Sequence, residues 1–294
     1  MPLKLPSVIG HRGNRKEWSY ENTTEALQYA LKVSDGFETD IELSKDEQIV
    51  VIHDTFYTGE KTLYELAKHL DQTSRQHIGA KRIDELNLSE ISGLHLTNGQ
   101  RIPALDDLTL LVKTNPEKFF NIELKASHSG HIIIERFKQE NIILNNDHIF
   151  FSSFNHLELS RIRTRYPDVK IGVLYEPGNT KQCPMYPWFD HDPALYIPFS
   201  LQHAQTAEIK DLNPDFFCLN EYDVGVDTLF ALRGQYPKSK IYVWWYFTEP
   251  PPQENTRFIH TLKHLQRENL LDMLAGIITD YPAAMHKMLG EIFL

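Results

Sequence analysis

The chain alternates short apolar runs with longer stretches in which apolar residues recur every three to four positions. The short runs are rich in β-branched and aromatic residues, which predicts strands covered on both faces. They are residues 7–11, 36–43, 119–124, 149–154, 170–175, 215–219, 240–246 and 276–279. The stretches between them predict helices over residues 21–33, 128–140, 156–166, 226–236 and 256–275.

Eight strands that alternate with helices indicate an α/β fold, the (β/α)₈ TIM barrel. An open doubly wound sheet is the alternative, but Gly10-His11-Arg12-Gly13 lacks the glycine spacing of a dinucleotide-binding turn. With 294 residues, the chain has the usual size of one barrel, and we expect a single domain over residues 1–294. Residues 38–43 and 48–53 form a hairpin-like pair, and we expect an insertion over residues 44–118 after the second strand. Residues 177–198, rich in proline and aromatic residues, predict a long loop over the barrel mouth.

Charge and composition narrow the classes of partner. The formal net charge of −10 argues against a nucleic-acid partner, because polyanions need a basic surface. Cys183 and Cys218 form no framework of disulfides and fit a reducing compartment. No apolar stretch approaches the roughly 20 residues that span a bilayer, and the N-terminus is too short and proline-broken for a secretory signal. We therefore expect a cytoplasmic protein with a small-molecule substrate and no transmembrane segment.

Three carboxylates lie on predicted strands. Glu38 and Asp40 are two positions apart, so both side chains face the same side of their strand. Glu123 closes a neighbouring apolar run, and inward-facing residues at the ends of barrel strands converge on the axis. Such oxygen ligands select Mg²⁺ or Ca²⁺. The ordinary alternatives are two solvated acids on a hairpin and an ion pair between Glu123 and Lys125.

Histidines and cationic side chains also lie at the ends of predicted strands. A single histidine at a strand end is more often structural, but His11 and His53 together offer one acid and one base. The planar guanidinium of Arg12 suits the oxygens of a phosphodiester. The alternative to this phosphate-binding role is a surface ion pair. Lys125 is placed to reach a phosphoryl oxygen. Of two adjacent tryptophans, one should face the barrel interior, and Trp244 is the candidate to wall a substrate pocket.

Several segments together resemble the glycerophosphodiester phosphodiesterase family. They are His11-Arg12-Gly13, Glu21-Asn22-Thr23, Glu38-x-Asp40, His53-Asp54, Glu123-Leu124-Lys125 and Thr279-Asp280-Tyr281-Pro282. The resemblance implies a TIM barrel that hydrolyses glycerophosphodiesters to glycerol 3-phosphate and an alcohol. It further implies that Glu38, Asp40 and Glu123 bind a divalent cation, that His11 and His53 are the general acid and base, and that Arg12 and Lys125 bind phosphate. Tyr20 stands where the family usually has proline, and residues 55–58 and 245–247 also depart from its pattern, which bears on the substrate's alcohol.

This resemblance suggests a mechanism in which the hydroxyl beside the ester attacks phosphorus. One histidine takes its proton and the other protonates the departing alcohol, and water then opens a cyclic phosphate with the roles reversed. Three other functions compete. The first is a phospholipase D-like enzyme acting on lysophospholipid or sphingomyelin, and the aromatic segment 186–199 would favour its acyl chain. The second is a barrel that binds phosphodiesters without turnover. The third is an isomerase-type barrel, which would not explain three carboxylates.

Overall fold

The fold is a closed barrel of eight parallel strands. The structure, a computed structural model, describes residues 5–14, 20–53, 69–78, 81–178, 196–245 and 256–293. Within these residues each barrel strand pairs in parallel with the next, and the last returns to the first. The strands are β1 (Ser7–Gly10), β2 (Gly36–Leu43), β4 (Phe119–Leu124), β5 (Ile149–Ser153), β6 (Lys170–Leu174), β7 (Phe216–Asn220), β8 (Lys240–Trp245) and β9 (Leu274–Thr279). The TIM barrel predicted from the sequence is thereby confirmed.

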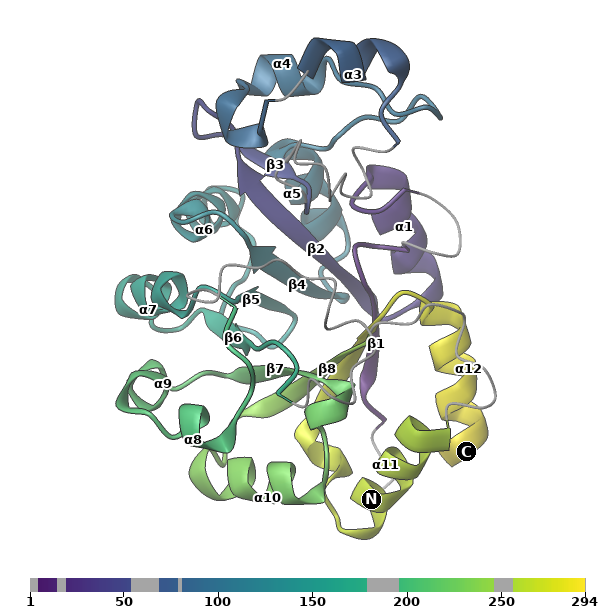
Figure 1. The fold of residues 1–294 in the computed structure, drawn as a ribbon, viewed down its shortest axis with the longest axis vertical. Helices are drawn as coiled ribbons and strands as arrows, with labels where there is room; N and C mark the ends of the chain where they lie inside the picture. Colours follow the sequence, from purple (N-terminus) through teal and green to yellow (C-terminus); the bar gives the residue numbers. More distant parts are fainter. Residues whose placement is uncertain are drawn as a thin grey trace.

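Helices surround the barrel, as Figure 1 shows. They are α1 (Thr24–Val33), α5 (Leu105–Thr114), α6 (Ser129–Gln139), α7 (His156–Arg165), α8 (Leu201–Ala204), α9 (Ala207–Leu212), α10 (Val226–Gln235), α11 (Thr256–Arg267) and α12 (Pro282–Phe293). The prediction of one helix over residues 256–275 was wrong at its end. Asn269 adopts a left-handed conformation with φ of 56°, which stops the helix. A short 3₁₀ turn, η4 (Leu271–Met273), then leads directly into β9.

A small layer with its own apolar core follows the second barrel strand. The strand β3 (Ile49–Val51) runs antiparallel to β2, with Ile41 opposite Val51, so the predicted hairpin is present. The elements α3 (Gln72–Ile78), η1 (Ile83–Glu85) and α4 (Leu88–Ser92) lie beyond one end of the helix ring (Figure 1). Their buried core contains Val50, Ile52, Leu70, Ile78, Ile83, Leu86, Ile91, Leu94, Leu96 and Ile102. Helix α5 falls within the predicted insertion 44–118, but it packs against α1 and α6 as part of the ring.

Alternation along the strands fills the barrel interior and positions the residues above it. The inward-facing core consists of Ile9, Phe150, Leu174, Phe216, Cys218, Tyr242 and Ile278. Because side chains two positions apart share a face, the next inward positions are His11 above Ile9, Glu176 above Leu174 and Trp244 above Tyr242. Polar chemistry therefore begins one layer above the apolar core, at the C-terminal ends of the strands.

Two further expectations concern membrane-spanning segments and the two cysteines. No helix among the described residues is both long and apolar enough to cross a membrane. Cys218 is a buried free thiol, and Cys183 lies outside the described residues. The cytoplasmic location, the single-domain organisation and the absence of a nucleic-acid partner stay predictions.

Gly36 provides a test of how closely β2 and β4 approach. A Cβ built on Gly36 would lie 1.8 Å from the carbonyl oxygen of Phe119, so Gly36→Ala forces the two strands apart. We expect this variant to lose about 2–4 kcal/mol of unfolding free energy, measured by urea denaturation. Gly234→Ala is the matched control, since nothing lies within 4 Å of that Cβ on α10. It should be as stable as the wild type or slightly more stable. Equal stability of both variants would contradict the observed strand approach.

Candidate active site

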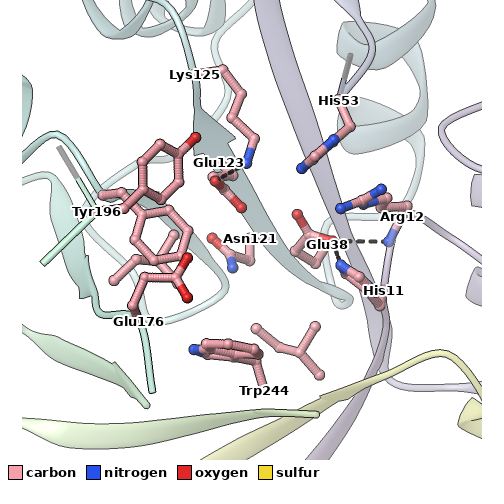
Figure 2. A pocket seen from close by; sticks show the side chains of 13 residues that line it. His11, Arg12, Glu38, His53, Asn121, Glu123, Lys125, Glu176, Tyr196 and Trp244 are labelled. Atoms are coloured by element: carbon pink, nitrogen blue, oxygen red, sulfur yellow. Dashed lines mark hydrogen bonds and ion pairs between the residues drawn. The ribbon is translucent and has the colours of Figure 1, made fainter. Parts of the chain in front are cut away.

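A cavity opens at the C-terminal ends of the barrel strands (Figure 2). Its volume, including the part open to solvent, is about 540 Å³. It is lined by His11, Arg12, Glu38, His53, Asn121, Glu123, Lys125, Phe154, Leu174, Glu176, Tyr196, Trp244 and Ile278. The lining includes every site residue predicted from the sequence except Asp40, which joins the site through its contacts with Lys125 and Arg12.

Three carboxylates converge at one side of this cavity. Glu38, Asp40 and Glu123 each present an oxygen, and these oxygens lie within 4.8 Å of one another. The strand register brings this about, because Asp40 pairs directly with Glu123 across β2 and β4. Oε1 of Glu38 and Oδ1 of Asp40 are buried and accept no hydrogen bond from the described residues. Buried carboxylate oxygens that accept no hydrogen bond are an arrangement that a hard cation satisfies.

Electrostatics support the same view of the cluster. Burial, and then the charges of Asp40 and Glu123, raise the pKa of Glu38 well above its usual value. Burial also raises the pKa of Glu123, against the opposing effect of Lys125. The pKa of Asp40 is lowered, because Lys125 and Arg12 together outweigh the cost of its burial. Lys125 and Arg12 therefore neutralise the cluster only in part, and the carboxylate set fits a divalent cation.

Arg12 is held inside the site by its own backbone geometry. It adopts a left-handed φ of 50°, and its N–H donates to Oε2 of Glu38 at 2.8 Å. Its Nη1 donates to Oε1 of Glu21 at 2.8 Å, and its Nε lies 3.4 Å from Oδ2 of Asp40. The residue is only 6% exposed, so the alternative of a surface ion pair is wrong.

Lys125 lies between two of the carboxylates. Its Nζ donates to Oε1 of Glu123 and lies 3.4 Å from Oδ1 of Asp40. Burial alone would lower the pKa of Lys125, but Glu123 and Asp40 raise it well above its usual value. The ammonium is therefore a fixed positive charge beside the acidic cluster.

The two histidines enter the cavity from different loops, and Figure 2 shows both rings on the side of Glu38. Nδ1 of His11 lies 2.6 Å from Oδ1 of Asp280, and Nε2 lies 3.9 Å from Oε2 of Glu38. A carboxylate accepts hydrogen bonds, so Nδ1 is the donor of this contact when Asp280 is ionised. His53 follows β3 by two positions, and its neighbour Asp54 lies outside the described residues.

Several residues of the site were not predicted from the sequence. Asp280 belongs to a motif that was recognised, but its contact with His11 joins residues 269 positions apart. Asn22 donates to Oδ2 of Asp40 at 2.9 Å. Asn121 and Glu176 line the cavity, and the period of two gives a signal for both, since Asn121 precedes Glu123 and Glu176 follows Leu174 by two positions. Tyr196 comes from the segment predicted to lie over the barrel mouth.

Glu221 gives a stability test at the same end of the barrel. It follows β7, is 4% exposed, and its Oε2 accepts no hydrogen bond from the described residues. Burial raises its pKa to about 7, against the opposing charge of Arg257. The folded chain therefore retains a proton that the unfolded chain releases from about pH 4.5 upward, and stability falls as pH rises between these two values.

We expect Glu221→Gln to remove this loss. Relative to the wild type it should gain up to about 3 kcal/mol at pH 8, and the difference should vanish near pH 4.5. Urea denaturation across this range measures it, with the exposed Glu268→Gln as control. Parallel curves for wild type and Glu221→Gln would contradict the assignment.

The fold and the site together define a class: a TIM barrel with buried carboxylates, histidines and cations gathered at its C-terminal mouth. The chain belongs to the glycerophosphoryl diester phosphodiesterase family, whose sequence model matches residues 11–283. The family resemblance drawn from the motifs is thereby confirmed.

Relatives of known name agree with the family. The chain is 31% identical over 184 residues to a glycerophosphodiester phosphodiesterase of Caldanaerobacter subterraneus subsp. tengcongensis, covering 58% of this chain and 67% of that protein. A protein of the same name from Bacillus altitudinis is 31% identical over 173 residues, covering 58% of this chain and 66% of the relative. The alignments thus span about two thirds of these relatives.

Solved structures share the fold. One is a glycerophosphodiester phosphodiesterase of Thermotoga maritima, with a TM-score of 0.62 and 22% identity over 97% of this chain and 99% of that one. Another is a phosphodiesterase of Oleispira antarctica in complex with its product sn-glycerol-3-phosphate. It gives a TM-score of 0.64 and 19% identity over 97% of both chains.

Proposed function

We propose that this chain is a divalent-cation-dependent hydrolase that converts glycerophosphodiesters to glycerol 3-phosphate and an alcohol. The observation that carries the proposal is one cavity that holds three clustered carboxylates, two cationic side chains and two histidines. Membership of the family and the names of the relatives support the same reaction. The product bound to the Oleispira antarctica phosphodiesterase supports the product we assign.

Glu38, Asp40 and Glu123 are the residues that would hold Mg²⁺ or Ca²⁺. Such an ion supplies neutralisation of phosphate charge and lowers the pKa of a bound hydroxyl. The chain adds its own positive charge, because Arg12 and Lys125 border the same carboxylates. Both side chains are fixed before substrate arrives, so they can bind phosphoryl oxygens without reorganisation.

His11 is our candidate for the base of the first step. Its Nδ1 contacts Asp280, so Nε2 is the nitrogen that would take the proton of the hydroxyl beside the ester. That oxygen then attacks phosphorus and forms a cyclic phosphate, while His53 gives a proton to the departing alcohol. In the second half water attacks, His53 takes its proton and His11 returns one to the ring oxygen. Trp244 walls the pocket in which the substrate's organic part lies.

A panel of phosphodiesters tests the function. Purified protein is supplied with Mg²⁺ or Ca²⁺ and assayed for glycerol 3-phosphate released from glycerophosphocholine, glycerophosphoethanolamine and glycerophosphoglycerol. Lysophosphatidylcholine and sphingomyelin are assayed in parallel for released choline, because faster turnover of either would favour the phospholipase D-like alternative. Binding by calorimetry with no product from any substrate would instead favour a non-catalytic barrel.

A further inference from the structure

Three consecutive residues, Tyr20, Glu21 and Asn22, connect the acidic site with a more distant part of the chain. Oε1 of Glu21 accepts a hydrogen bond from Nη1 of Arg12 at 2.8 Å. Nδ2 of Asn22 donates to Oδ2 of Asp40 at 2.9 Å. Glu21 and Asn22 are buried, and neither is among the described residues that line the cavity. They therefore bear on the site through the residues that they hold.

Asn22 gives this turn an unusual backbone. Its φ of 56° is left-handed, a conformation that asparagine tolerates but that persists only when the surroundings hold it. Its N–H donates to the Arg12 carbonyl at 2.9 Å. Oγ1 of Thr23 donates to the Tyr20 carbonyl at 2.7 Å, which closes the turn just before α1. The contacts of Tyr20 therefore help to hold the conformation in which Asn22 reaches Asp40.

The side chain of Tyr20 packs against the small layer that follows β2. Its ring stacks on the ring of His69, with centroids 4.0 Å apart and an angle of 17° between the planes. Its hydroxyl forms a hydrogen bond of 2.8 Å with Oγ1 of Thr97. His69 and Thr97 are joined to each other, since the N–H of Thr97 donates to the His69 carbonyl at 2.7 Å. The adjacent Leu70 and Leu96 form an antiparallel bridge and belong to the buried core of the layer. Tyr20 thus rests on a surface that is itself fixed.

The same layer also holds the backbone of Asp40. The N–H of Ile52, a residue of the layer's core, donates to the Asp40 carbonyl at 3.1 Å. His53 is the next residue along the chain. Asp40 is therefore held from two directions, by Ile52 at its backbone and by Asn22 at its carboxylate. A shift of the turn relative to the layer would displace this carboxylate, and the contacts of Tyr20 oppose such a shift.

We propose that Tyr20 is a positioning residue, which anchors the turn to the small layer and thereby orients Asp40 for the cation and Arg12 for the phosphate. The inference rests on the proposed function, since the cation and the phosphate are those of that reaction. Tyr20 is not among the described residues that line the cavity, so it acts without touching the substrate. It is also one of the positions at which the chain departs from the family pattern.

The first readout is cation affinity in the absence of substrate. Tyr20→Ala should raise the Kd for Mg²⁺ or Ca²⁺ by about tenfold in a calorimetric titration, because the outer partners of a metal ligand affect affinity to this extent. With saturating cation, kcat on glycerophosphocholine should also fall by about tenfold, since groups that are displaced no longer meet the reacting atoms. Tyr20→Phe keeps the stacked ring and should retain most of the affinity and of the rate.

A second variant tests whether the ring contact carries the effect. His69→Ala removes the other half of the stack and should raise the Kd as Tyr20→Ala does, and the double variant should add little to either change. Tyr29→Ala is the matched control, because Tyr29 is a half-buried tyrosine on α1, and it should leave both the Kd and kcat unchanged. Thermal melting shows that each variant is folded.

The outcomes separate this inference from the function on which it rests. If the wild type is active and Tyr20→Ala equals it in Kd and kcat, the positioning role is overturned while the function stands. Fully additive losses in the double variant would also overturn it. If no diester is hydrolysed, the proposed function fails, and the Kd for the ion decides the role of Tyr20 alone.

If no ion binds either, amide hydrogen exchange is the remaining readout. Tyr20→Ala should speed exchange at the N–H of Asn22, which donates to the Arg12 carbonyl, because the turn then opens more often. Equal exchange at Asn22 in the wild type and in Tyr20→Ala would overturn the proposal.

Discussion

Replacing His11 or His53 by alanine should lower kcat on glycerophosphocholine by about 10²–10⁴-fold, because each variant removes one of two proton transfers. The rate of glycerol 3-phosphate release measures the loss. His264→Ala is the control, since that side chain is 61% exposed on α11, where it lies 3.8 Å from Glu268 one turn away. It should stay near the wild-type rate. If either site variant also stays near wild type, the two-histidine mechanism is wrong.

A change of leaving alcohol distinguishes the roles of the two histidines. A glycerophosphodiester of p-nitrophenol releases an anion that needs no proton, so His53→Ala should lose far less activity on it than on glycerophosphocholine. His11→Ala should remain impaired on both substrates, because the attacking hydroxyl still has to give up its proton. The reverse pattern would exchange the roles of His11 and His53.

Removal of divalent cations should abolish activity, and addition of Mg²⁺ or Ca²⁺ should restore it. The physical reason is the donor set: Oε1 of Glu38 and Oδ1 of Asp40 are buried and accept no hydrogen bond from described residues. Arg12 and Lys125 offset the cluster's charge only in part. Chelator followed by each ion, with glycerol 3-phosphate release as the readout, measures the effect.

Metal binding also has a readout that is independent of turnover. The ion should raise the melting temperature of the wild type, because a ligand of the folded state stabilises it. Glu38→Gln should reduce that increase and lower kcat by about 10²-fold or more. Asp106→Asn, whose side chain is 82% exposed, is the control and should behave as the wild type. Full activity in chelator, with no shift in melting temperature on adding either ion, would refute the metal site.

The parts of the fold that follow from local pattern could be predicted from the sequence. The bounds of β2 and β4 were predicted correctly, because each is an almost continuous run of buried residues. Helix α11 was predicted too long, since a single left-handed asparagine ends it and the following apolar residues belong to a strand. Helix α5 was grouped with the insertion, because position in the ring depends on its contacts with α1 and α6.

Only some residues of the candidate site could likewise be predicted from the sequence. Residues that share a strand, such as Glu38 and Asp40, could be assigned to one face from spacing alone. Contacts that depend on barrel closure could not, and the bond between His11 and Asp280 is the clearest example. Glu176 was missed for a different reason: it has no motif around it, and only the inward position of Leu174 two residues earlier indicates where its side chain lies.

The pairing of β1 with β9 sets an order for the assembly of the site during synthesis. All three carboxylates of the cluster lie within the first 123 residues, on two strands that pair with each other. All three are therefore synthesised when less than half of the chain has been made. The partner that orients His11 is added only with Asp280, after the last strand has closed the ring. The contact that orients His11 therefore requires a closed barrel, whereas the three carboxylates lie on two neighbouring strands that are made early.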